Sequence, residues 1–223
     1  MAITFTEENY IKAIFKLEEK SNKQPINTND IAVSLSMKPA SVTDMIKRLS
    51  DKKWISYKKY YGVLLTKKGK EIALDVVRKH RLWEVFLVNK LQFKWDEVHV
   101  IAEQLEHINS KELINKLDDF LGNPKFDPHG DLIPTREGKI EPQQSFPLST
   151  ITKKQKLVFS GVLNHEPKFL QYLTSINIEL GHSIEILSFN NFDRSYKLLI
   201  HKKHQEFMSE HIASQILVQH HGK

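Results

Sequence analysis

The sequence contains no cysteine. This absence excludes disulfide bonds, zinc knuckles, iron–sulfur clusters and a thiol nucleophile, and it fits a cytoplasmic chain. Only eight glycines occur, and none belongs to a GxGxxG motif, a P-loop or a GxSxG motif. No hydrophobic run approaches the roughly 20 residues that cross a bilayer, and residues 1–8 lack the features of a signal peptide. We therefore expect neither a membrane protein nor a common nucleotide-binding enzyme or serine hydrolase.

Positive charge is concentrated near the start of the chain. The 223 residues include 33 Lys and Arg against 27 Asp and Glu, a net charge of +6. Residues 1–72 hold 14 basic and 8 acidic residues, so the whole excess lies in the first third. A basic N-terminal module on an otherwise neutral chain favours a polyanionic partner.

The hydrophobic pattern of residues 1–72 predicts a helix-turn-helix. A first helix is expected to begin at Thr6, which suits the N-cap position and precedes two glutamates. Thr28 can cap a short second helix, and Pro39 suits the first turn of a third. Four apolar residues of the third helix recur at i, i+3, i+4 and i+7 and share one face. They are Val42, Met45, Ile46 and Leu49. Two short helices joined by a tight turn form a helix-turn-helix.

A β-hairpin is expected to follow, with strands at Trp54–Tyr57 and Gly62–Thr66. Its turn carries two lysines and two tyrosines, which is typical of the wing in winged-helix DNA-binding domains. The alternative is a small helical module whose lysines only solvate its surface. Charge, helix-turn-helix and wing together favour DNA binding.

The polar face of the third helix and the wing supply the residues predicted to contact DNA. Asp44 is expected either to accept a hydrogen bond from a cytosine amine or only to cap a local bond. Tyr60 and Tyr61 are interpreted as packing within the wing. Short polar residues and Lys47 would meet bases or phosphates, and the wing lysines would reach phosphates. The predicted set is Lys38, Pro39, Ala40, Ser41, Thr43, Asp44, Lys47, Lys58 and Lys59.

The remainder of the chain changes from helical to β-like patterning. Helices are predicted over Lys68–Leu91, Trp95–Ile108 and Lys111–Phe120. Residues 123–150 are rich in Pro, Asp and Gly and are expected to be irregular. From residue 151 onward, short β-like runs surround a short helix at 168–177 and predict a small β-barrel-like domain. The runs are Leu157–Phe159, Ser183–Phe189 and Tyr196–His201.

One stretch has the residue types and spacing of a metal site. Four potential ligands stand at i, i+4, i+7 and i+8, which would place them on one helical face. They are His99, Glu103, Glu106 and His107. His80 and Glu84 repeat the pattern at i and i+4 on the preceding helix. Oxygen and nitrogen ligands without sulfur suit Mn, Fe(II), Zn, Co or Ni rather than Cu(I). The alternative is a solvated polar face, because eleven histidines make a coincidence more frequent.

Several segments together carry a specific resemblance to a known family. They are TEENYI at 6–11, KPASVT at 38–43, LTKKG at 65–69, RKHRLWE at 78–84, the His99–His107 stripe, and DPHG at 127–130 before Ile133-Pro134. Over nearly the whole chain they resemble the diphtheria toxin repressor / manganese transport regulator (DtxR/MntR) family. Its members are homodimeric, metal-activated transcription regulators.

The resemblance implies a mainly α fold with β structure and three domains. We expect a winged-helix DNA-binding domain at 1–72, a helical metal-binding and dimerisation domain at 73–140, a linker at 141–150 and an SH3-like (FeoA-like) domain at 151–223. The implied partners are double-stranded operator DNA and a second copy of the chain, with no membrane and no small organic substrate. A metal-dependent enzyme is the alternative from another class, but no nucleophile or second motif supports it.

The resemblance also implies a ligand set. In the family's primary site one ligand comes from the first helix and the others from an E/C-x-x-E-H run. The matching positions here are Asn9, Glu103, Glu106 and His107. The positions that match the ancillary site of the iron-type members are His80, Glu84 and His99. The C-terminal ligands of the iron type have no clear counterpart around Ser160–His165.

The residue at position 103 separates the subfamilies, because iron-type repressors have Cys there and manganese-type repressors have Glu. A carboxylate is harder than a thiolate, so Glu103 favours Mn(II), with Fe(II) as the alternative and Zn(II), Co(II) or Ni(II) as surrogates. Two positions depart from the family. Asn9 stands where the manganese type has Asp and the iron type Met, and Lys12 stands where the manganese type has a ligand Glu. We therefore expect a weaker or single-ion primary site.

Overall fold

The computed structural model describes residues 3–21, 24–141 and 144–220. The chain forms two compact units, each built from segments that are distant in the sequence. The first combines residues 1–80, 103–115 and 134–139, and the second combines 81–102, 116–133 and 140–223. Positions 142 and 143 of the predicted linker and positions 221–223 of the predicted last domain lie outside the described residues. No described helix has the length and hydrophobicity needed to span a bilayer.

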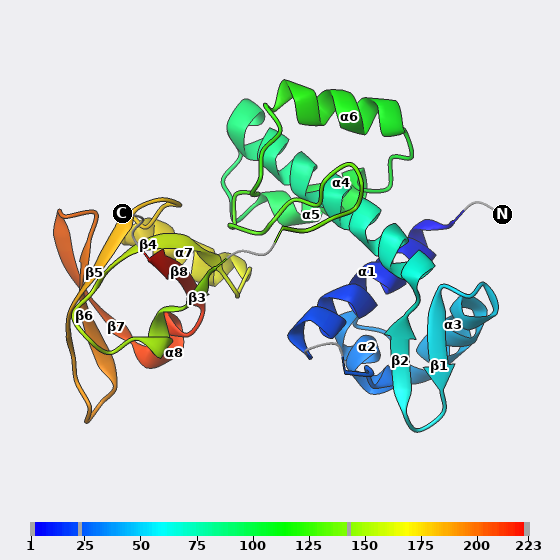
Figure 1. The fold of residues 1–223 in the computed structure, drawn as a ribbon, viewed down its shortest axis with the longest axis horizontal. Helices are drawn as coiled ribbons and strands as arrows, with labels where there is room; N and C mark the ends of the chain where they lie inside the picture. Colours follow the sequence, from blue (N-terminus) through cyan, green and yellow to red (C-terminus); the bar gives the residue numbers. More distant parts are fainter. Residues whose placement is uncertain (1–2, 22–23, 142–143, 221–223) are drawn as a thin grey trace. The chain divides into compact units, whose positions relative to one another are not determined.

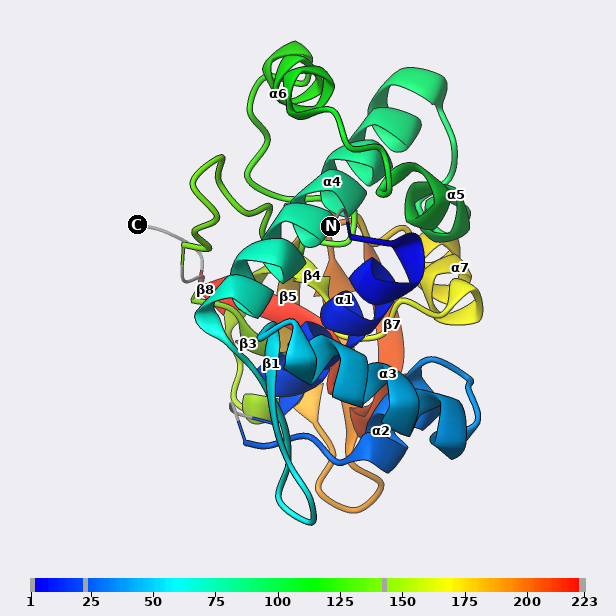
Figure 2. The same cartoon turned by 90° about the vertical axis from the view of Figure 1, so that its right-hand side faces the viewer.

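The first unit contains the winged helix-turn-helix, which confirms the predicted fold. Its elements in chain order are α1 (Phe5–Lys20), α2 (Thr28–Ser34), α3 (Pro39–Asp51), β1 (Ile55–Lys58) and β2 (Gly62–Leu65). The two strands pair antiparallel. Figures 1 and 2 both show the hairpin projecting beyond α2 and α3. Val42, Ile46 and Leu49 are fully buried, so the apolar face of α3 holds it in place and leaves its polar face outward.

The start of α1 differs from the prediction. Thr4, not Thr6, is the N-cap, and its hydroxyl accepts a hydrogen bond from the Glu7 backbone N–H. The Glu7 carboxylate accepts from the Thr4 N–H in return, at 3.1 Å. This reciprocal capping box needs a Glu three residues after the cap, which Thr4 has and Thr6 lacks.

Three further helices follow the wing: α4 (Lys67–Leu91), α5 (Val98–Leu105) and α6 (Lys111–Phe120). The predicted bounds of α4 and α6 hold to within one residue. α5 is shorter than the predicted helix at both ends. A turn from Lys94 to Glu97 precedes it, and Glu106 and His107 lie in the turn that follows Leu105. The four candidate ligands of this stretch therefore do not share one helical face.

The C-terminal part is a sheet of six antiparallel strands in the order β3-β8-β4-β5-β6-β7. The strands are β3 (Phe146–Pro147), β4 (Lys156–Val162), β5 (Ser183–Phe189), β6 (Ser195–Ile200), β7 (His204–Ser209) and β8 (Ile216–His220). The helices α7 (Pro167–Ser175) and α8 (Glu210–Ala213) and a 3-10 turn at Leu148–Thr150 complete it. Alternate strand residues such as Ile184, Ile186 and Leu198 fill the core, as a period of two requires. The three predicted strands are present, and β3, β7 and β8 were not anticipated.

Candidate metal centres and DNA-binding surface

Two buried side chains of the first unit, Lys12 and His80, meet at a third, Glu106. The Lys12 Nζ from α1 lies 2.5 Å from Glu106 Oε2 and 3.1 Å from His80 Nδ1 on α4. His80 Nδ1 is itself 2.6 Å from Glu106 Oε2. Burial raises the pKa of Glu106, but the hydrogen bond from His80 and the charge of Lys12 outweigh it and lower that pKa below its usual value. Glu106 is therefore an anion that accepts both partners on one oxygen.

The other oxygen of Glu106 gives a test of whether a cation fits here. Within the described part of the chain, the buried Oε1 has no hydrogen-bond partner. An unsatisfied buried acceptor is costly, and a metal ion satisfies it. Glu103 lies one helical turn before Glu106 and His107 directly follows it, and carboxylates and imidazoles are ligand types that Mn(II) and Fe(II) accept. The residue types present thus fit a divalent cation.

A second pair of the first unit joins α1 to the same turn. Glu8 Oε2 lies 2.6 Å from His107 Nδ1, and Lys79 Nζ is 3.5 Å from Glu8 Oε1. The Phe5 ring stacks on the His107 ring at a centroid distance of 4.6 Å. Glu8 is buried, whereas the neighbouring Asn9 is exposed. The sequence analysis missed Glu8 as a site residue, although it directly precedes the position that the resemblance marked.

Two other predicted primary-site residues are more open. Glu103 lies 3.9 Å from Lys12 through its Oε1, and its side chain is 52% exposed. Asn9 is exposed on α1, where it precedes the buried Lys12 by three residues, one helical turn. The structure thus brings Glu103, Glu106 and His107 to α1, and the assignment of Asn9 as a ligand stays a prediction.

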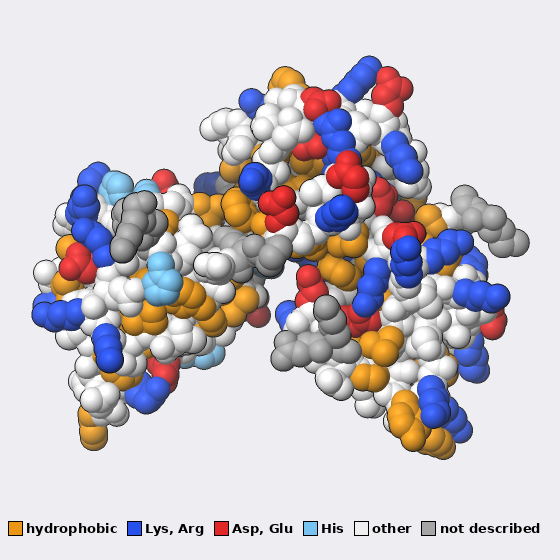
Figure 3. Space-filling model, in the orientation of Figure 1, with side chains coloured by type: hydrophobic (Ala, Val, Ile, Leu, Met, Phe, Trp, Pro, Cys, Tyr) orange, Lys and Arg blue, Asp and Glu red, His pale blue; other side chains and the backbone are white. Residues whose placement is uncertain are grey.

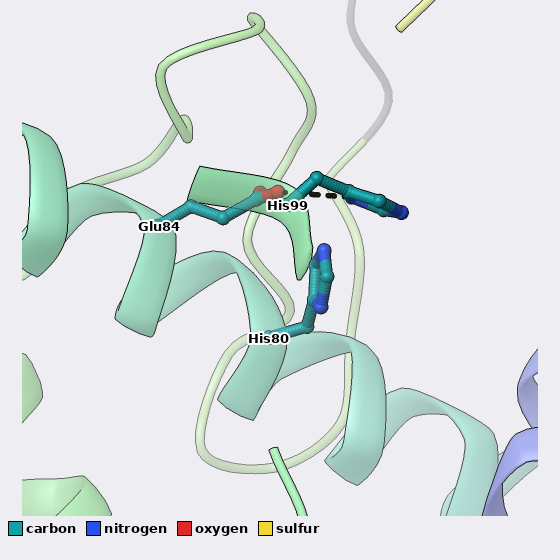
Figure 4. A group of neighbouring side chains, drawn as sticks. All are labelled: His80, Glu84 and His99. Atoms are coloured by element: carbon teal, nitrogen blue, oxygen red, sulfur yellow. Dashed lines mark hydrogen bonds and ion pairs between the residues drawn. The ribbon is translucent and has the colours of Figure 1, made fainter. Parts of the chain in front are cut away.

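The predicted ancillary residues form a second group. His80 and Glu84 are one turn apart on α4, and His99 comes from α5, with its Nδ1 3.3 Å from Glu84 Oε1. One candidate ligand atom from each of the three lies within 4.8 Å of the others. Figure 4 shows Glu84 and His99 facing each other and one ring nitrogen of His80 directed toward them. This is the arrangement that the i, i+4 spacing predicts for a shared ligand face.

The second unit adds two residues that the sequence analysis did not treat as ligands. Glu84, Asp127 and His129 form a fully buried group with candidate ligand atoms within 4.8 Å of one another. Burial alone lowers the pKa of His129, but the hydrogen bond and charge of Glu84 raise it to about 9. Burial, together with the carboxylates of Asp131 and Glu84, raises the pKa of Asp127 well above its ordinary value. The DPHG motif at 127–130 was the available signal.

The loop that carries His129 is fixed against β4 in the same unit. The Val162 N–H donates to the His129 carbonyl at 3.0 Å. Gly130 has φ of +89°, and a Cβ at this position would lie 2.1 Å from the Ser160 carbonyl oxygen. Only glycine allows both this left-handed backbone and such a close approach. The loop therefore holds His129 beside Glu84 through its contact with the C-terminal sheet.

The predicted DNA-binding residues lie on the surface of the winged helix. All nine are exposed except Thr43, which is half-buried and donates a hydrogen bond to the Pro39 carbonyl at 3.0 Å. Lys47 is 3.7 Å from Asp44, so these two residues of α3 form an exposed ion pair. Figure 3 shows Lys and Arg side chains gathered over the winged helix, on the face in view. Such a surface suits the phosphates of a duplex.

The wing tip corrects one interpretation. Tyr60 and Tyr61 do not pack into the wing, because they are 91% and 69% exposed. Each ring instead lies under a lysine ammonium, with Lys59 4.9 Å from the Tyr60 centroid and Lys58 4.0 Å from the Tyr61 centroid. Tyr60 has φ of +68°, a left-handed backbone conformation that is uncommon for a residue other than glycine.

A winged helix built into the same unit as a carboxylate–imidazole group is the architecture of a metal-responsive transcription regulator. Comparison with known proteins gives the same result. Residues 2–63 match the family described as iron dependent repressor, N-terminal DNA binding domain. Residues 66–135 match its metal binding and dimerisation domain, and 146–220 match the FeoA domain.

Individual relatives include both metal types. The HTH-type transcriptional regulator MntR of Geobacillus thermodenitrificans is 35% identical over 51% of this chain and 79% of its own length. The iron-dependent repressor IdeR of Mycobacterium bovis is 33% identical over 58% of this chain and 55% of its own length. A solved manganese-dependent transcriptional repressor in complex with manganese is 30% identical, covers 95% of this chain and 98% of that one, and gives a TM-score of 0.86.

The chain belongs to the DtxR/MntR family of metal-dependent transcriptional regulators. It is thus a metal-dependent DNA-binding repressor, and the alternative of a metal-dependent enzyme is set aside because the family consists of regulators.

Proposed function

We propose that this regulator responds to Mn(II) and represses genes of metal-ion uptake. The observation that carries the proposal is the donor set at the end of α5 and in the turn that follows it, where Glu103, Glu106 and His107 supply oxygen and nitrogen without a thiolate. Hard ligands favour Mn(II) over softer ions. Fe(II) is the second candidate, because an iron-dependent relative matches at similar identity.

The proposed primary site uses Glu103, Glu106 and His107 with a ligand from α1. Glu106 would offer its free Oε1, and His107 is already held by Glu8. Asn9 is the α1 ligand by resemblance, and Glu8 is the second candidate, since its Oε2 lies 2.6 Å from His107 Nδ1. His80, Glu84 and His99 form the proposed ancillary site, to which Asp127 and His129 add donors.

A divalent ion would supply positive charge that joins α1 to the turn after α5. Packing within the chain carries the effect to the DNA-binding helix. Because α1 packs within the winged helix, fixing the position of α1 also fixes the position of α3. Two copies of α3 in the proposed homodimer would enter successive major grooves of operator DNA, about 34–36 Å apart. The proposed domains are 1–72, 73–140 and 151–223 with a linker at 141–150, and the proposed location is the cytoplasm, where such DNA is accessible.

The metal proposal is tested by titration of the metal-free protein. Mn(II), anaerobic Fe(II) and Zn(II) are added separately, and the affinity for an operator selected from random-sequence duplexes is measured at each concentration. For each metal we compare the free concentration that activates operator binding with the free concentration in the cell. We expect this ratio to be lower for Mn(II) than for Zn(II). Activation by Fe(II) but not Mn(II) would replace the proposal with the iron-responsive alternative.

Substitutions at two positions should change the metal response in opposite ways. Asn9→Asp adds a charged ligand, so Mn(II) binding should tighten and operator binding should need less metal, because opposite charges attract strongly in a partly desolvated site. Calorimetry of Mn(II) binding checks this. Equal or weaker affinity removes Asn9 from the ligand set and leaves Glu8 as the α1 ligand. Glu103→Cys should shift the preference from Mn(II) toward softer ions.

Lysines of α3 and the wing should contribute to DNA binding without sequence preference. Lys47→Ala and Lys58→Ala are expected to weaken binding to operator and random duplex alike. Each substitution should make the fall of log K with log salt concentration less steep, by about 0.9 for every DNA phosphate that the variant no longer neutralises. Ser41 and Thr43 substitutions should instead change the preferred sequence, since short polar side chains at the start of α3 meet base edges.

Fluorescence anisotropy across a salt series measures these slopes. Lys153→Ala, which removes an exposed lysine from the stretch before β4, is the control for net charge and should leave the slope unchanged. Unchanged slopes for both Lys47→Ala and Lys58→Ala would show that a different face meets DNA.

A further inference from the structure

Lys12 is a buried lysine whose ammonium group lies among the candidate ligands of the primary site. The residue is 5% exposed, and its Nζ is 2.5 Å from Glu106 Oε2, 3.1 Å from His80 Nδ1 and 3.9 Å from Glu103 Oε1. A buried ammonium is costly unless a counter-charge satisfies it. The negative charge of Glu106 compensates the Lys12 ammonium here, and the ammonium in turn compensates the Glu106 carboxylate.

The two oxygens of Glu106 are used unequally. Lys12 and His80 both contact Oε2, whereas Oε1 has no hydrogen-bond partner within the described residues. A metal ion can therefore bind Oε1 while Lys12 stays on Oε2. Two cations then share one buried carboxylate, where their mutual repulsion is stronger than in solvent. The ammonium weakens metal binding without blocking it.

Lys12 also connects the elements that a metal ion would connect. It reaches from α1 to Glu106 in the turn after α5 and to His80 on α4, all within the first unit. The tie holds α1 in place when no ion is bound. The same side chain thus stabilises the metal-free arrangement and opposes the metal.

We propose that Lys12 is a counter-cation within the primary site. Its charge raises the metal concentration needed for activation, and its contacts hold α1 in place when no metal is bound. The inference rests on the proposed function in one respect, that Glu106 is a metal ligand. It adds a positioning residue that sets the threshold of the sensor.

The test is Mn(II) binding to the metal-free full chain by calorimetry, with no DNA present. Lys12→Met removes the charge and keeps an unbranched apolar stem, and the Kd for Mn(II) is expected to fall at least tenfold. Lys12→Arg keeps the charge and should bind no more tightly than the wild type. Lys70→Met is the matched control, because Lys70 Nζ pairs with another buried α1 carboxylate, Glu18, at 3.5 Å. Its Kd should not change.

A second readout is operator binding in the presence of chelator. Without metal, Lys12→Met should bind operator more weakly than the wild type. The difference in operator affinity between its metal-free and metal-loaded forms should therefore be larger. Removal of a merely structural interaction would not tighten Mn(II) binding, so the fall in Kd separates the two roles. Far-UV circular dichroism verifies folding, and Lys12→Gln replaces Lys12→Met if the latter does not fold.

The outcomes separate this inference from the proposed function. Equal or weaker Mn(II) binding in Lys12→Met, with normal binding by the wild type, overturns the role of Lys12 and leaves the manganese proposal intact. Absence of Mn(II) binding in the wild type and all variants overturns both. Tighter binding in Lys70→Met as well would show a general effect of net charge, which also overturns the specific role of Lys12.

Discussion

Glu106→Gln is expected to reduce operator affinity about 10- to 100-fold in saturating Mn(II), the loss that corresponds to a coupling free energy of about 1–3 kcal/mol. Glu106 is buried and anionic and accepts Lys12 and His80 on one oxygen, so it links α1 to the turn after α5. The amide of Gln has nearly the same shape but no negative charge, and it binds a divalent ion weakly. Chelation of metal from the wild type should give a loss of the same size.

Fluorescence anisotropy with the selected operator measures both losses. Glu179→Gln is the control, because it removes one negative charge from an exposed site before β5. Its operator affinity should equal that of the wild type. Far-UV circular dichroism must show unchanged helix content in Glu106→Gln. Full operator affinity in Glu106→Gln would rule out the role of Glu106 in activation. Full operator affinity in the chelated wild type would rule out metal as the activator.

Gly130→Ala is expected to destabilise the second unit by about 2–5 kcal/mol. Holding a non-glycine residue in a left-handed backbone costs roughly 1–2 kcal/mol. The added Cβ would also lie 2.1 Å from the Ser160 carbonyl oxygen, and relief of such overpacking costs a further 1–3 kcal/mol or so. The shift would also move His129, whose carbonyl accepts from Val162 on β4.

Gly122→Ala is a matched control for the backbone term. Gly122 lies in the same unit with φ of +81°, and nothing lies within 4 Å of its Cβ position. Its loss should be only about 1–2 kcal/mol. Urea unfolding followed by tryptophan fluorescence is a suitable probe, because Trp95 stacks on His129 at 5.9 Å. Equal losses in the two variants would show that the loop does not press on β4.

Local patterns in the sequence were enough to predict the winged helix. Pro39 at the start of α3 and the apolar spacing of Val42, Ile46 and Leu49 act over a few residues, and the hairpin follows from its own alternation. Strand β7 was missed because only Met208 of its six residues is fully buried, so its hydrophobic alternation is weak. β8 was missed although Ile216 and Val218 alternate as strand residues do.

The candidate site was predictable in its residue types but not in its pairing. The periodicity of residues 98–107 continues past Leu105, yet Glu106 and His107 leave the helix and contact Lys12 and Glu8 on α1. Those contacts join residues that are distant in the sequence, which no local pattern encodes. Asp127 and His129 follow the same rule, because only the fold brings an irregular loop beside Glu84 on α4.

The central claim, that metal and operator binding are coupled through the site at α1, is tested most directly by measuring Mn(II) affinity with and without operator. Linkage requires that DNA tighten metal binding by the same factor by which metal tightens DNA binding. We therefore predict that operator-bound protein binds Mn(II) about 10- to 100-fold more tightly than free protein, and that Glu106→Gln loses this difference. Identical Mn(II) affinities in the presence and absence of operator would contradict the account.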